Sequence, residues 1–203
     1  MTVLALWLLL AQPAMAQSDV PPSVAPLLKA DDDQLINRTY LEPQTKPVGE
    51  VRLLRRGNAS VVQTMLYTEV LRRVVGEISK KENNNWPQDH PQRGDAARFL
   101  DALTEAQQIM WSKVPKHERG ADRRQNLLIE FVLSPEASVV LFSEYELRDG
   151  PDGVEITDRR LLSSLELSRE YVRRNMELIV ADSFKVPAGE ARTLLAALPG
   201  WAQ

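Results

Sequence analysis

Three glutamates, Glu130, Glu144 and Glu146, stand in neighbouring stretches of sequence where polar and apolar residues alternate. Two carboxylates placed across a glycosidic bond can act as acid and base or nucleophile, so Glu130 with Glu144 is a candidate hydrolytic pair. His90 is the third catalytic candidate, because an accessible imidazole titrates near neutral pH and can act as a general base. The same alternation is also typical of a sheet with one solvated face, in which these side chains would have no catalytic role.

Metal and cofactor chemistry has little support in the sequence. His90 and His117 are the only histidines, and the chain has no cysteine. If residues 95–114 form a helix, the two histidine loops lie about 29 Å apart along its axis, so no shared metal site is expected. The G-x-S-x-G, H-E-x-x-H and glycine-rich phosphate motifs are also missing. The sequence therefore predicts no metal and no cofactor.

Trp86 is the residue best suited to molecular recognition. It stands between Asn85 and Pro87 in a polar stretch, away from any periodic apolar face. Exposed aromatic rings in loops favour binding surfaces, so Trp86 is predicted to contact a partner. The alternative is that the ring folds back and caps a pair of helices.

The charge balance argues against nucleic acid. The chain has 28 acidic and 25 basic residues and a formal net charge of −3, whereas non-specific nucleic-acid binding relies on a positive field. Arginines occur in adjacent pairs, such as Arg173 and Arg174. Such pairs suit an acidic polymer, but they are equally typical of a solvated face that carries both signs. No nucleic-acid partner is predicted.

The first sixteen residues predict export. An apolar run from Val3 to Ala11 is followed by Ala14, Met15 and Ala16, which is the pattern of a signal peptide cleaved near Ala16. The run of about nine residues is too short to span a membrane, so no integral span is expected in the mature form. The predicted location is the periplasm, or the exterior. Five prolines then mark residues 17–47 as a flexible, proline-rich arm.

Residues 48–203 are predicted to form a single α+β domain, which begins with a short strand at 48–54. Ser60 and Gln63 make a capping-box pattern before apolar residues spaced three and four apart, which predicts a helix over 60–81. Residues 82–94 are polar and predict a loop, after which Asp95 is expected to cap a second helix that ends before Pro115. The two helices predict an antiparallel hairpin.

The apolar period changes to two after residue 125. Strands are predicted at 127–133, 139–147 and 154–160, forming a meander with helices on one face and water on the other. A third helix is expected from the spacing of Leu165, Val172, Met176 and Ile179, with Ser168 as a candidate internal start and residues 176–181 open between helix and strand. A last helix is expected over about 188–198. The predicted fold class is therefore α+β: an antiparallel β-meander packed against a two-helix hairpin, with C-terminal helices.

Three functions follow from these observations. Because no catalytic motif is recognisable, the leading hypothesis is an exported periplasmic binding or accessory protein that acts through a protein partner in the cell envelope. The first alternative is a periplasmic hydrolase of glycan-type substrates that uses Glu130 together with Glu144 or His90. The second is a carrier of small apolar ligands, with a cavity lined by Phe131, Phe142 and Leu103.

Overall fold

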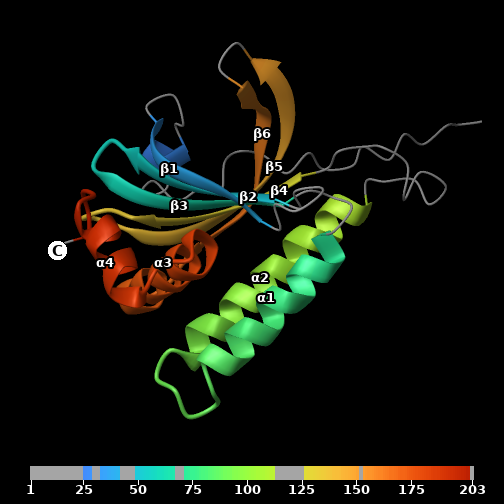
Figure 1. Cartoon of the computed structure of the whole chain (residues 1–203). Helices are drawn as coiled ribbons and strands as arrows, with labels where there is room; N and C mark the ends of the chain where they lie inside the picture. The colour runs from blue at the N-terminus through green and yellow to red at the C-terminus, as the bar shows by residue number, and fades with distance from the viewer. Residues whose placement is uncertain are drawn as a thin grey trace, which may run out of the picture.

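The computed structural model of the chain describes residues 25–28, 33–41, 49–66, 71–112, 126–150 and 153–201. Within these ranges the chain forms an antiparallel sheet whose strands lie in the order in which they occur in the sequence (Figure 1). The strands are β1 (Asp33–Leu41), β2 (Gly49–Arg56), β3 (Ala59–Leu66), β4 (Asn126–Leu133), β5 (Ser138–Gly150) and β6 (Gly153–Glu166). The predicted signal peptide lies outside the described residues.

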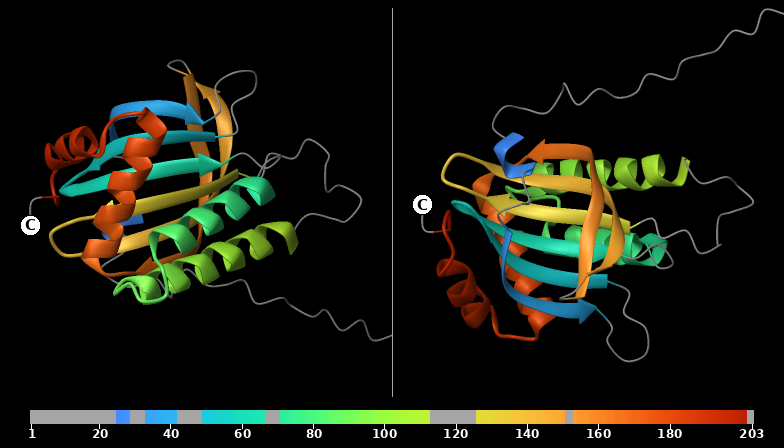
Figure 2. Two further views of the ribbon diagram at one scale, coloured as in Figure 1. Left: turned by 60° about the horizontal axis from the view of Figure 1, so that its bottom comes forward. Right: turned by 90° about the horizontal axis from the view of Figure 1, so that it is seen from above.

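The α-helices gather on one face of this sheet (Figure 1). They are α1 (Leu71–Asn85), α2 (Arg93–Ser112), α3 (Arg169–Phe184) and α4 (Ala188–Ala196), and a short 3-10 helix, η2 (Ala25–Leu28), precedes β1. In Figure 2, α1 and α2 run side by side as a hairpin, and α3 crosses the sheet with α4 beside it. No helix in the described part of the chain has the length and hydropathy that a membrane span requires. The predicted fold class is confirmed.

The main core lies between the sheet and the helices. The ring of Phe99 on α2 packs against Phe131 and Phe142, with centroid distances of 5.5 and 5.7 Å. Leu103, one turn further along α2, is fully buried in the same cluster. Phe131, Phe142 and Leu103, which the carrier alternative places around a cavity, are buried members of this core cluster.

The helix predicted over residues 60–81 is wrong in its first part. Ala59–Leu66 form β3, which pairs with β2 through a tight turn at Gly57 and Asn58, where Gly57 has a φ of 57°. Every residue of β3 is buried, because the strand has sheet neighbours on both sides. Its apolar residues therefore do not alternate with polar ones, and such a run includes the three- and four-residue spacings that are typical of a helix. Gly-Asn between two such runs is the hairpin signal that identifies the turn.

Two further boundaries also differ from the sequence predictions. α1 continues to Asn85, so residues 82–85 of the expected polar loop are helical, and α2 begins two residues before Asp95. Asp33–Leu41 lie within the predicted arm but pair with β2 as an edge strand, so the prediction of an unpacked arm is corrected there. Residues 176–181, left open between strand and helix, belong to α3, whose N-cap is Ser168 as expected.

The second face of the sheet is not the wet surface that the sequence predicts. It carries buried apolar side chains from β2, β3, β4 and β5, including Leu54, Val61, Val132 and Leu141, and Leu27 of η2 packs on them. The pairing of β5 with β6 shifts register at Phe142/Ser143 and at Glu144/Glu146. Such irregularities bend a strand pair. In Figure 1, the outer part of the β5–β6 hairpin rises from the sheet, and Ile156 and Leu161 of β6 pack on the buried side chains of this second face.

Candidate functional site: an arginine-lined groove

Glu130 lies at the centre of a buried ion cluster on the second face of the sheet. Its side chain has no exposed surface, and its Oε1 lies 2.7 Å from Nη2 of Arg56 and 3.0 Å from Nε2 of Gln63. Arg159 of β6 donates to the other carboxylate oxygen, and Arg56 also pairs with Asp33 of β1. These five residues, Asp33, Arg56, Gln63, Glu130 and Arg159, are called the ion cluster below. They hold β1 and β6 to the centre of the sheet.

The surroundings of Glu130 favour an ionised carboxylate with a structural role. Burial disfavours its charged form, but the charges of Arg56 and Arg159 outweigh burial and hold the pKa of Glu130 below its usual range. A carboxylate held in this way has neither a proton to donate near neutral pH nor access to a substrate.

Glu144 and His90 do not meet Glu130. In the β4–β5 register Glu144 lies opposite Leu127, on the helix-bearing face, whereas Glu130 points to the other face. Glu144 pairs with Arg160, and partial burial together with the charge of Glu146 raises its pKa. His90 lies in the loop between α1 and α2, where its Nδ1 accepts a hydrogen bond from the backbone N–H of Gln92. The residues of the predicted hydrolytic site therefore occupy three separate places.

Trp86 is buried rather than exposed, with 3% of its surface accessible. Its ring centroid lies 4.7 Å from that of His90 and 5.2 Å from that of Tyr171, so the ring is packed between the interhelical loop and α3. The hydroxyl of Tyr171 donates to Glu82 of α1 at 2.7 Å. The expectation of an exposed loop aromatic is corrected: the ring folds back and locks the α1–α2 hairpin onto α3, which was the alternative.

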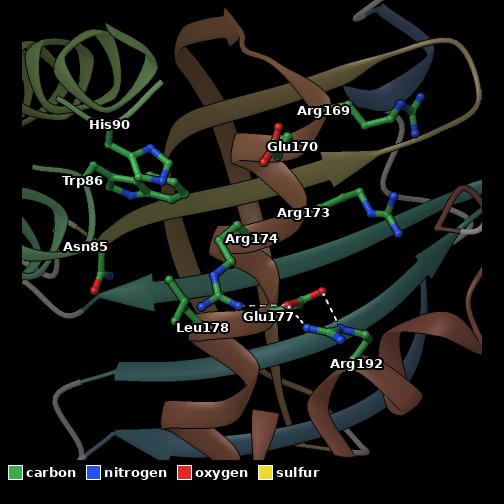
Figure 3. A pocket seen from close by; sticks show the side chains of 10 residues that line it. All are labelled: Asn85, Trp86, His90, Arg169, Glu170, Arg173, Arg174, Glu177, Leu178 and Arg192. Atoms are coloured by element: carbon green, nitrogen blue, oxygen red, sulfur yellow. Dashed lines mark hydrogen bonds and ion pairs between the residues drawn. The ribbon is translucent and has the colours of Figure 1, made fainter. Parts of the chain in front are cut away.

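Beside Trp86, a groove of about 710 Å³ opens between α3, α4 and the α1–α2 loop (Figure 3). Most of its lining comes from one side of α3, whose residues recur three to five positions apart, as one helix face requires. The lining residues are Asn85, Trp86, His90, Arg169, Glu170, Arg173, Arg174, Glu177, Leu178 and Arg192. Four arginines thus face two glutamates, and this surface is called the arginine groove below.

The arginines differ in their partners. Arg174 and Arg192 share the carboxylate of Glu177, at 3.2 and 3.1 Å. Arg169 donates instead to backbone carbonyls, among them those of Pro135 and Gly200. The guanidinium of Arg173 lies over the ring of Trp201, 5.0 Å from its centroid.

Two of the four positive charges are therefore not neutralised by the groove itself. Among the described residues, Arg169 and Arg173 form no ion pair with a carboxylate. Figure 3 shows both side chains extending to the same side of α3, away from Trp86 and His90. Such a pair of guanidiniums can bind carboxylate or phosphate oxygens by two-point hydrogen bonds.

Sequence reasoning named Trp86 and His90 but missed the arginine groove. In the sequence, Arg173 and Arg174 stand out only as one of several adjacent arginine pairs. The usable signal was their position relative to Arg169: residues four apart share one face of a helix. Arg192 joins them only through the packing of α4 on α3.

Comparison with known proteins gives no further guide to function. No protein-family model matches the chain. No curated protein is similar to it in sequence.

Proposed function

We propose that the chain is an exported binding or accessory protein of the periplasm that holds an acidic segment of a protein partner in the arginine groove. The observation that carries the proposal is the surplus of guanidinium groups there, with Arg169 and Arg173 outside any ion pair among the described residues. Planar guanidiniums are the preferred protein ligands for carboxylates. The signal-peptide pattern before Gln17 supports the location.

The dimensions of the groove suit a short segment of chain. A volume of about 710 Å³ lies within the range of sites that take a small ligand or a few residues of a peptide. Trp86 and His90 form an aromatic wall, and Leu178 adds an apolar contact. A partner segment with acidic side chains beside an apolar one would match this lining.

The test is a binding measurement with a defined acidic peptide. Fluorescein-labelled tetraglutamate is titrated with the purified protein at physiological ionic strength, and tetraglutamine serves as the neutral control. Arg173→Ala is expected to weaken binding about tenfold or more, as loss of a central charged contact does. Arg160→Ala removes the same charge from β6, outside the groove, and is expected to leave binding nearly unchanged.

Two results would contradict the proposal. One is equal weakening by the Arg173 and Arg160 variants, which would indicate only a general charge effect. The other is identical affinity for tetraglutamate and tetraglutamine. Arg173 also stacks on Trp201, so Arg173→Ala could weaken binding by disturbing the fold. The melting temperature of each variant tests for this, and Arg173→Lys, which keeps the positive charge, provides a second comparison. Native mass spectrometry of the protein from its host's periplasm then identifies the partner.

A further inference from the structure

Glu177 already occupies part of the arginine groove with a carboxylate. Its Oε1 accepts from Nε of Arg192 at 3.1 Å, and its Oε2 accepts from Nη2 of the same guanidinium at 3.2 Å. Nη1 of Arg174 adds a third hydrogen bond at 3.2 Å. This is the two-point geometry in which a guanidinium binds a carboxylate group. Figure 3 shows Glu177 held between the two arginines.

The three side chains differ in exposure. Glu177 keeps 11% of its side-chain surface, whereas Arg192 and Arg174 keep 60% and 49%. The carboxylate of Glu177 is therefore held close to the surface of its own helix, α3. The guanidinium groups of Arg174 and Arg192 approach it from the solvent side and can rotate away from it into solvent. Ion pairs with an exposed partner stabilise a protein only weakly, so exchange of one carboxylate for another has a small cost.

We propose that Glu177 is an internal counter-ion of the arginine groove, and that the ligand displaces it from Arg192 and Arg174 with a carboxylate of its own. This inference rests on the proposed function. Arg173 binds the ligand first, because no carboxylate among the described residues occupies it, and the exchange at Arg192 follows. Glu177 thus lowers the affinity for acidic ligands and sets how many carboxylates a ligand needs to bind.

Glu170 provides a matched control in the same groove. It lines the groove one helical turn before Arg174, but its carboxylate accepts from the side chain of Gln92 at 3.3 Å rather than from an arginine. Glu170→Gln and Glu177→Gln therefore change the net charge of the groove equally. Only the second variant releases two guanidiniums.

The experiment measures tetraglutamate affinity by fluorescence anisotropy for the full protein and its variants. Glu177→Gln is expected to bind about fivefold tighter than the parent protein, the fold-change that corresponds to one surface ion pair. Glu170→Gln removes the same charge but releases no guanidinium, so it is expected to tighten binding by only about twofold. Adding Arg192→Ala to Glu177→Gln is expected to remove most of the gain, because Arg192 makes two of the three hydrogen bonds to Glu177 and only Arg174 is then released.

The outcomes separate this inference from the proposed function. Equal gains from Glu177→Gln and Glu170→Gln, or no gain from the former, overturn the counter-ion role while a loss in Arg173→Ala keeps the binding function. If neither the parent protein nor any folded variant binds tetraglutamate, the proposed function itself is wrong. If Glu177→Gln does not fold, Glu177→Asp, which shortens the side chain, is expected to give a smaller gain, and its absence overturns the inference.

Discussion

Nη2 of Arg56 and Oε1 of Glu130 lie 2.7 Å apart inside the molecule, and their side chains are 3% and 0% exposed. Both ions have lost their water. Each recovers hydrogen bonds from the rest of the ion cluster, and Arg56 also donates to the backbone carbonyl of Leu27 at 2.6 Å. Removal of Glu130 leaves Arg56 with Asp33 alone and Arg159 with no carboxylate among the described residues. The loss of a partner by a buried charge is among the most costly changes that a protein interior can undergo. The pair therefore makes the sheet depend on residues that the sequence places 74 positions apart.

Glu130→Ala is expected to destabilise the protein by about 3–5 kcal/mol, because Arg56 and Arg159 would remain buried without their shared carboxylate. Urea denaturation followed by circular dichroism measures the change. The matched variant is Glu144→Ala, whose partner Arg160 is 54% exposed, and it is expected to cost less than about 1 kcal/mol. Equal losses in the two variants would contradict a special role for burial.

The raised pKa of Glu82 predicts how the stability of the protein depends on pH. Burial raises the pKa of Glu82, although the hydrogen bond from Tyr171 opposes it. A carboxyl group that binds its proton more tightly in the folded state contributes stability below its unfolded pKa of about 4.3. That contribution is lost as the pH rises through the folded pKa. Glu82→Gln, neutral throughout, is expected to gain stability relative to the parent at pH 7 but not at pH 4.

Urea denaturation of both proteins at pH 4 and pH 7 measures this difference. If the Gln variant is less stable by the same amount at both values, the hydrogen bond between Tyr171 and Glu82 matters more than burial of the charge. Such a result would make Glu82 a fixed anchor of α1 on α3.

Trp86→Ala is expected to lower the free energy of unfolding by about 3–5 kcal/mol, because it removes a buried ring packed against Tyr171 and His90. Differential scanning calorimetry follows the loss. Trp86→Phe, which keeps an aromatic ring in the same place, is expected to recover most of it. An unchanged melting temperature in Trp86→Ala would instead indicate that the ring is available to a partner.

Gly200→Ala is expected to destabilise the C-terminal segment by about 1–3 kcal/mol. Gly200 has a φ of 77°, and a Cβ there would lie 2.4 Å from the backbone carbonyl oxygen of Leu133. Displacement of the backbone at Gly200 would move Trp201, and tryptophan fluorescence would report the movement. It would also move the ring over which the guanidinium of Arg173 lies. Gly94→Ala in α2, where a Cβ meets nothing within 4 Å, is the control and is expected to be neutral or stabilising.

The sequence was informative where a pattern had one structural meaning. Alternation around Ile129 and Phe131 identified β4 correctly, and Ser168 marked the start of α3. The helix predicted at Ser60 failed because β3 pairs with β2 on one side and with β4 on the other. The Ser60 hydroxyl donates to the carbonyl of Pro199 instead of capping a helix, and no local pattern reveals that partner.

The site was harder to predict than the fold for the same reason. The pairing of Glu177 with Arg192 joins two helices across a turn, and the burial of Glu130 depends on Arg159 from a strand bent over the sheet. One local sign existed: Glu130 is the single charged residue in a strand of otherwise buried apolar residues and Asn126. A glutamate is fully buried only when it is paired, so a lone glutamate inside an unbroken apolar strand indicates an interior ion pair.

The order of the sheet also determines how the chain can fold. Leu66 pairs with Leu127, although about sixty residues separate them and the α1–α2 hairpin lies in that interval, whereas the other neighbouring strands are joined by short connections. We expect the β2–β3 and β4–β5 hairpins to form early, and their docking through β3 and β4 to limit the folding rate. Ile129→Val should then slow refolding in stopped-flow experiments more than Leu54→Val does, and equal effects would contradict this order. The helical hairpin that walls the arginine groove would thus reach its place only when the two halves of the sheet join.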